Sequence, residues 1–352
     1  MKNLVSSTAL KSSQVPVKLS NRSFLPGSDH PSMPSHISKN PTETFPLVLQ
    51  PISNSSAKNI SIKEWVKETE FWIEEVLHKY GAILVRGLPL SSADDFSHFI
   101  DILNYELMDY TSGTGIRNVV SGNVSTASNE LSSVSLEPHN EMAYTRNYPS
   151  KILFFAQTPA PKGGEGVIVD VREYAKLLDP EIKQKLQETG IKYIRFLQDR
   201  RFGGYTSWQD SFLTNDKEVV IKFMNEHNYD FNWDENDNLT YSQVLSPIVK
   251  HPKTGEEIWF NQPHSHHASY FYYHPDFIDS KLEPHLYPFH CQLGDGTELS
   301  LDLIAHIRQK IWLSAVSIQW QKGDVLILDN LLVQHGRMSF EGPRQMFVSI
   351  LK

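Results

Sequence analysis

The sequence predicts a mainly β domain with surrounding helices (α+β), in the form of a β-sandwich or a jelly-roll barrel. After residue 104, most apolar runs have the length of strands and are separated by polar turns that contain Gly or Pro. Helical patterns are interleaved with these runs, and further apolar runs return late in the chain. Sheets of this kind must hide their edges, so we expect a β core that carries helices on its outside.

The composition limits the classes of protein that are possible. Of the 352 residues, 39% are hydrophobic and 21% are charged, a globular composition that excludes wholesale disorder. The longest apolar runs, such as residues 325–328, are far shorter than the ~20 residues of a spanning helix, so no membrane partner is expected. A net charge of -8 argues against DNA or RNA as a partner.

Cysteine usage indicates the compartment and the available metal ligands. Cys291 is the single cysteine of the chain, so neither an internal disulfide nor a thiolate cluster can form. This suits a reducing, cytoplasmic location. It also leaves histidine and carboxylate side chains as the metal ligands that the chain can offer.

The N-terminal segment differs from the rest of the chain. Residues 1–44 are rich in Ser and Pro, have no acidic residue before Asp29, and show no apolar periodicity, so we predict a disordered arm. An organelle transit peptide is the weaker alternative, because an Arg-rich amphipathic helix is missing. No linker-like stretch follows residue 104, and we predict one catalytic domain over residues 45–352.

The domain opens with a helix, a strand and a second helix. Apolar residues recur at helical spacing between Ile62 and Tyr80, and Gly81 ends this pattern. Residues 82–85 form a short β-rich run, and Ser92 is placed to cap a helix that continues to Leu103.

The remaining elements follow the same two patterns. Strands are expected at 151–155, 167–169, 193–197, 258–260, 316–320, 325–328 and 345–350. Helices are expected at 171–178, 179–189, 216–227 and 299–314.

A candidate metal site combines two distant segments. His139 and Glu141 are two residues apart, so on an extended strand their side chains would point to the same face. His335 follows a strongly apolar run, and two imidazoles with one carboxylate suit non-haem Fe(II) with open positions. A His-x-Glu pattern alone is common by chance, and most such histidines are surface or hydrogen-bonded core residues. The signal is the combination of these three residues with Arg344, nine positions after His335.

Seven segments carry a resemblance to a known family. They are GAILVRG at 81–87, PHNEMAY at 138–144, YPSKILFF at 148–155, KGGEG at 162–166, WFNQ at 259–262, GDG at 294–296, and the closing WQKGD, DN, His335 and Arg344. In their order and spacing, from about Phe45 to Lys352, the chain resembles the clavaminate synthase-like branch of the taurine dioxygenase superfamily. The resemblance implies an Fe(II)/2-oxoglutarate-dependent oxygenase on a double-stranded β-helix (jelly-roll) core.

The resemblance also implies roles for individual residues. His139, Glu141 and His335 would bind Fe(II), and Arg344 would hold the distal carboxylate of 2-oxoglutarate, with O2 as the second co-substrate. Related halogenases lack the carboxylate, so Glu141 favours hydroxylation, with release of succinate and CO2. Desaturation and cyclisation use the same iron site and stay open.

One departure concerns the co-substrate. Where relatives commonly have Gly-Gly-Glu-Thr, this chain has Gly166 in the last position, so a hydroxyl expected to hold 2-oxoglutarate is missing. A hydrogen bond to a charged group contributes about 1.5–3 kcal/mol, and we therefore expect weaker binding with Arg344 as the main anchor.

The substrate and its contacts are less defined. Members of the branch often modify amino acids, free or on carrier proteins, so an amino-acid-like small molecule, in specialised biosynthesis, is the expected substrate. Asn261, His264 and Arg337 are candidate substrate contacts, although Arg337 is equally suited to a surface ion pair. Adjacent histidines on an extended segment point in opposite directions, so His264, His266 and His267 would not all bind one ion. Trp259, Trp320 and residues 270–273 are expected in the core or a lid.

Two other classes of function remain. One is a jelly-roll binding or scaffold protein without turnover, for which Gly166 would be the first sign. The other is a zinc hydrolase on the same ligands, which would have no use for Arg344. Release of succinate would separate the oxygenase from both.

Overall fold

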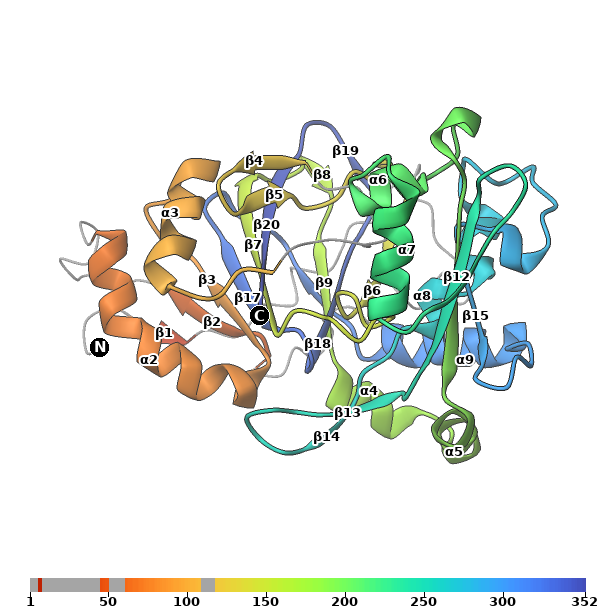
Figure 1. Cartoon of the computed structure of the whole chain (residues 1–352). Helices are drawn as coiled ribbons and strands as arrows, with labels where there is room; N and C mark the ends of the chain where they lie inside the picture. The colour runs from red at the N-terminus through yellow and green to blue at the C-terminus, as the bar shows by residue number, and fades with distance from the viewer. Residues whose placement is uncertain (1–5, 8–44, 51–60, 109–117) are drawn as a thin grey trace.

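Two sheets pack against each other at the centre of the protein (Figure 1). The computed structural model describes residues 6–7, 45–50, 61–108 and 118–352. The larger sheet has the order β1 (Ser6–Ser7), β2 (Leu47–Gln50), β3 (Ala82–Val85), β17 (Val325–Asp329), β7 (Lys151–Thr158), β20 (Gln345–Leu351), β5 (Val124–Thr126) and β4 (Val119–Ser121). The smaller sheet has the order β16 (Val316–Ile318), β9 (Gly166–Asp170), β18 (Val333–Arg337) and β6 (Leu136–His139).

The larger sheet is buried on both faces. In β17, Leu326 and Leu328 belong to the core shared with the smaller sheet, whereas Val325 and Ile327 belong to a second core. Helices α2 (Ile62–Tyr80) and α3 (Ala93–Leu103) cover that second core at the left of Figure 1. Burial of both faces explains why this strand reads as an unbroken apolar run.

Both covering helices begin at capping boxes. The hydroxyl of Ser61 accepts from the backbone N–H of Glu64, whose carboxylate accepts from the backbone N–H of Ser61. Ser92 and Asp95 repeat the arrangement at α3. These reciprocal bonds satisfy backbone donors that a helix start leaves free.

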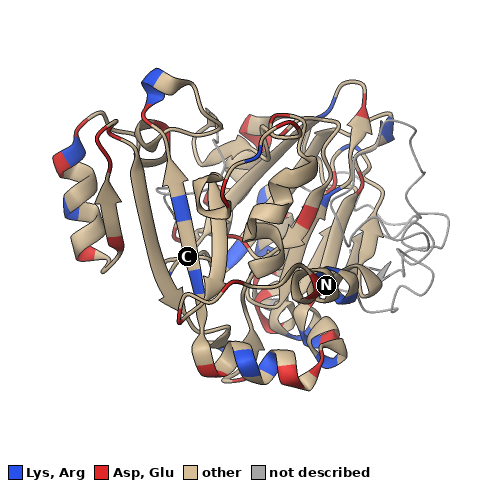
Figure 2. Ribbon diagram, turned by 90° about the vertical axis from the view of Figure 1, so that its right-hand side faces the viewer, with Lys and Arg blue, Asp and Glu red and all other residues tan. Residues whose placement is uncertain are grey.

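A third sheet and further helices extend the core. The third sheet has the order β11 (Asp230–Trp233), β12 (Leu239–Leu245), β10 (Ile191–Leu197) and β15 (Phe289–Leu293). There are also two two-stranded sheets, one of β13 (Ile248–Lys250) with β14 (Glu257–Trp259) and one of β19 (Phe340–Glu341) with β8 (Lys162–Gly163). The helices are α4 (Val171–Leu177), α5 (Pro180–Thr189), α6 (Trp208–Phe212), α7 (Lys217–Glu226), α8 (Pro263–His266) and α9 (Leu301–Leu313), with 3-10 turns η3 (Arg200–Phe202), η4 (Ala268–Tyr273) and η5 (Pro284–Leu286). Figure 2 shows basic and acidic residues interspersed along the outer helices.

The predicted helices and strands are confirmed, with ends that shift by at most three residues. Short strands such as β2, β4 and β11 were not predicted. Among the strands of five or more residues, β12, β15 and β18 were not predicted, because polar residues occupy their buried positions. In β12, for example, the Gln243 amide donates to the Tyr144 carbonyl and the Tyr229 hydroxyl, partners that only the tertiary fold supplies. Of the predicted arm at 1–44, only Ser6–Ser7 are described, as a strand paired with β2, and the rest lies outside the described residues. No helix in the described ranges is long and apolar enough to cross a membrane.

Candidate active site

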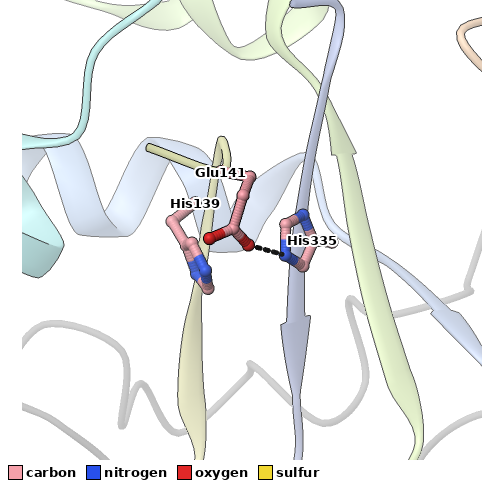
Figure 3. A group of neighbouring side chains, drawn as sticks. All are labelled: His139, Glu141 and His335. Atoms are coloured by element: carbon pink, nitrogen blue, oxygen red, sulfur yellow. Dashed lines mark ion pairs between the residues drawn. The ribbon is translucent and has the colours of Figure 1, made fainter. Parts of the chain in front are cut away.

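Three candidate metal ligands meet at the end of the smaller sheet. His139 is the last residue of β6 and lies directly opposite His335 of β18 in the antiparallel register. The two ring centroids are 4.6 Å apart, and His335 Nε2 is 3.5 Å from a carboxylate oxygen of Glu141. All three ligand atoms lie within 4.8 Å of one another, and Figure 3 shows the side chains pointing toward a common point. This donor set suits non-haem Fe(II) with open positions.

Glu141 reaches the site by a turn. We expected an extended strand to align it with His139, but this reason is wrong, since β6 ends at His139 and Met142 has φ 58° in the turn that follows. The side chain of Asn330 holds this turn: its oxygen accepts from the Glu141 N–H at 2.7 Å, and its amide donates to the carbonyls of Glu141 and Pro149. The Asn140 amide donates to the Asn330 carbonyl and so turns away from the site, whereas Met142 lines the cavity described below.

The hydrogen bond of His139 determines which nitrogen can bind a metal. His139 Nδ1 lies 2.8 Å from the carbonyl oxygen of Glu137, which can only accept, so Nδ1 carries the proton. Nε2 is then the unprotonated nitrogen and the one that can bind a metal. Such a bond from the distal ring nitrogen orients metal-binding histidines.

A buried ion pair lies behind His139. Arg308 of α9 is 1% exposed, and its Nε is 3.0 Å from the carboxylate of Glu137. The same guanidinium donates to Ser269 Oγ and to the His264 carbonyl. Arg308 thereby ties β6 to α8 and η4.

A cavity of about 820 Å³ opens beside the three ligands. It has room for a small 2-oxo acid together with a further small molecule. His139, Glu141 and His335 line it, and so do two arginines, Arg337 and Arg344.

The two arginines bring positively charged groups to the cavity wall. Burial, and then the charge of Arg337, lower the pKa of Arg344 to about 9, so its guanidinium remains charged at neutral pH. Arg344 directly precedes β20. Its Nε is buried and has no hydrogen-bond partner within the described ranges. Arg337 is 4% exposed and donates to the carbonyls of Glu130, Leu131 and Met338, so the surface ion pair considered for it is wrong.

A buried carboxylate lies on the same cavity wall. Glu130 accepts from the Tyr205 hydroxyl at 2.6 Å, from His274 Nε2 at 3.1 Å and from the Leu131 N–H at 2.8 Å. Burial alone would raise the pKa of Glu130, but the hydrogen bonds of His274 and Tyr205 outweigh it and lower the pKa to about 2. The sequence carries no motif that marks this group.

The other predicted contacts lie away from the cavity lining. Asn261 is 1% exposed and donates to the Pro247 carbonyl, and His264 Nε2 lies 2.7 Å from the Pro138 carbonyl. Burial lowers the pKa of His264 to about 3. The segment is the short helix α8 and not the extended run we expected, and of its histidines only His266 lines the cavity.

A second group, His267, His290 and Glu298, has its ligand atoms close enough together to hold a metal ion. The hydrogen bonds of the two histidine rings argue against such a site. Nδ1 of His267 accepts from the Ser269 N–H, and Nδ1 of His290 accepts from the Ala268 N–H. The proton of each neutral ring therefore sits on Nε2, which in His290 donates to Glu298 at 2.9 Å. A protonated nitrogen cannot bind a metal, and we assign this group a structural role.

Comparisons with known proteins identify the family of this chain. Residues 44–350 match the sequence profile of the family described as "Taurine catabolism dioxygenase TauD, TfdA family". The dapdiamide synthesis protein DdaC of Enterobacter agglomerans is 33% identical over 299 residues, 84% of this chain and 89% of that protein. A clavaminate synthase-like protein of Arabidopsis thaliana is 30% identical over 322 residues, 88% of this chain and 94% of that protein.

A solved structure shows the same fold. PvcB of Pseudomonas aeruginosa, described as an Fe, alpha-ketoglutarate dependent oxygenase from an isonitrile synthetic pathway, superposes with a TM-score of 0.51 at 14% identity. The match covers 99% of this chain and 91% of that one. It confirms the predicted jelly-roll core.

Proposed function

Since the chain belongs to the TauD/TfdA family of Fe(II)/2-oxoglutarate-dependent dioxygenases, we propose that it hydroxylates an unactivated C–H bond of an amino acid or amino-acid-derived small molecule, free or carrier-bound. The cofactor of the family is Fe(II), with 2-oxoglutarate and O2 as co-substrates. The observation that carries the proposal is the convergence of His139, Glu141 and His335 on a cavity that also contains Arg344.

Each group of the site has a role in this proposal. His139, Glu141 and His335 would hold Fe(II), and Arg344 would hold the distal carboxylate of 2-oxoglutarate. When bound, the iron and co-substrates supply oxidation of a C–H bond to C–OH, coupled to conversion of 2-oxoglutarate and O2 to succinate and CO2. Glu141 would hold the iron where related halogenases lack a carboxylate, which would favour hydroxylation over halide transfer.

The charges of the cavity wall support an amino-acid-like substrate. The Arg337 guanidinium and the Glu130 carboxylate both line the cavity, so the wall offers a positive and a negative group to one ligand. An α-amino acid carries the complementary pair of charges. We propose Arg337 as the partner of the substrate carboxylate and leave Asn261 and His264 out of the substrate site.

Succinate formation tests the proposal. The protein with Fe(II), ascorbate, O2 and 2-oxoglutarate should release succinate with a panel of free amino acids and aminoacyl carrier proteins, and the product should gain one oxygen atom by mass spectrometry. The His335→Ala variant is the matched control. If wild-type protein forms no succinate and calorimetry finds no 2-oxoglutarate binding, the scaffold alternative replaces the oxygenase.

A further inference from the structure

The indole of Trp320 fills the space beside Gly166 that a threonine side chain would need. A Cβ added to Gly166 would lie 2.9 Å from Cζ2 and 3.0 Å from both Cε2 and Nε1 of Trp320. Gly166 of β9 is paired with Ile318 of β16, and Trp320 lies two residues beyond Ile318. Since such contacts are shorter than van der Waals packing allows, a threonine at 166 and this position of the indole exclude each other.

The indole N–H of Trp320 is a buried donor without an acceptor within the described residues. That alone is not distinctive, because Trp208 and Trp312 also have unpartnered indole N–H groups. Among the tryptophans that the structure describes, however, only Trp320 lines the cavity. Trp320 therefore combines a place in the cavity lining with an unsatisfied buried donor, and such a donor calls for an acceptor.

Arg344 lies along the same glycine-rich segment. A Cβ added to Gly164 would lie 3.4 Å from Arg344 Cδ, two residues before the glycine that faces Trp320. Arg344 Nε is likewise buried and unpartnered within the part of the chain described. Two unsatisfied donors, one of them charged, therefore flank residues 164–166 and fit a carboxylate.

We propose that Trp320 Nε1 donates a hydrogen bond to the distal carboxylate of 2-oxoglutarate, in place of the threonine hydroxyl that relatives commonly have. Arg344 binds the same carboxylate, so the inference rests on the proposed role of Arg344. Gly166 is then not a lost contact, as the sequence suggested, but the residue that leaves room for the indole.

Binding of 2-oxoglutarate to the Trp320→Phe variant is the direct test. Phenylalanine keeps an aromatic ring and removes the N–H, so we expect the Kd to rise by about tenfold or more, the effect of one hydrogen bond to a charged group. The Kd is measured anaerobically with Fe(II), by calorimetry and by the visible charge-transfer band. Trp208→Phe, which removes an unpartnered N–H in a separate hydrophobic cluster, should bind like wild type.

A ligand without the distal carboxylate shows which group the indole binds. The monocarboxylate 2-oxobutanoate should bind equally to wild type and Trp320→Phe. If Trp320→Phe weakened both ligands equally, or neither, the assignment would be overturned. Arg344→Ala distinguishes failure of the Trp320 assignment from failure of the co-substrate site. If both Trp320→Phe and Arg344→Ala bound 2-oxoglutarate like wild type, the co-substrate site itself would lie elsewhere. If only Arg344→Ala lost affinity for 2-oxoglutarate, only the role of Trp320 would be overturned.

A reciprocal pair of variants tests the exchange of donors. Gly166→Thr alone should weaken 2-oxoglutarate binding, because its Cβ displaces the indole. In a Trp320→Leu background the same substitution should tighten binding, because the smaller side chain leaves room for a hydroxyl donor. The same sign of effect in both backgrounds would contradict the proposal. Melting curves of each variant check that the fold is retained.

Discussion

The guanidinium of Arg344 faces a cavity in which no described carboxylate pairs with it. Removal of a desolvated charge partner costs about 2–5 kcal/mol, so Arg344→Ala should raise the Kd for 2-oxoglutarate by roughly thirtyfold or more. Arg344→Lys keeps the charge but loses the planar fork and should lose less affinity. Calorimetry under anaerobic conditions gives both values, and unchanged binding in the alanine variant would contradict the assignment.

Asn330 is the residue whose role only the structure shows. Its side chain makes three hydrogen bonds that hold the Glu141 turn, although it makes no contact with a metal ligand atom in those bonds. Loss of such an outer partner typically lowers metal affinity by about 10–100-fold, which we expect for Asn330→Ala. Asn330→Asp keeps the acceptor for the Glu141 N–H and should therefore lose less metal affinity than Asn330→Ala. Competition titration with a metal chelator measures the metal affinity. An equal loss of metal affinity in both variants would argue against the role of Asn330 in holding the Glu141 turn.

At the scale of elements, α9 positions the strand that carries His139. The buried pair of Arg308 and Glu137 joins them, and removal of one partner from such a pair costs about 3–5 kcal/mol. Arg308→Met should therefore lower the unfolding free energy by that amount. In the double variant Arg308→Met, Glu137→Gln no buried charge is left unpaired, so it should be more stable than the single variant. Urea unfolding measures both, and additive losses would contradict the prediction.

At the scale of the whole molecule, buried neutral histidines should make the fold sensitive to acid. Burial, then the charges of His290 and Arg308, lower the pKa of His267 from 6.5 to about 3. Between these values the unfolded chain binds more protons than the folded protein, so the unfolding free energy should fall as the pH falls. His267→Asn keeps an acceptor for the Ser269 N–H and should make this dependence shallower by up to about 1.4 kcal/mol per pH unit. Urea unfolding at pH 7 and pH 5 gives the slope, and an unchanged slope would contradict this.

We also propose that residues 45–352 form one folding unit. The main hydrophobic core contains residues from Phe45 to Ile350, so it is not divided into separate parts along the chain. A protein that lacks residues 1–44 should keep a single cooperative melt, with a small loss from the β1 pairing with β2. A broad or biphasic melt by calorimetry would show that the N-terminal segment is needed.

Local patterns in the sequence determined the helices and most of the longer apolar strands. The candidate metal ligands followed from the combination of His139, Glu141 and His335 with Arg344, and from the family resemblance. Periodicity and capping residues such as Ser92 act over a few residues, so they can be read without the fold. Tertiary structure alone decided that Glu141 reaches the site through a turn held by Asn330, that Asn261 and His264 lie off the cavity, and that Trp320 faces Gly166. These contacts join segments far apart in the chain, and their existence depends on strand register, which brings β16 and β18 to either side of β9.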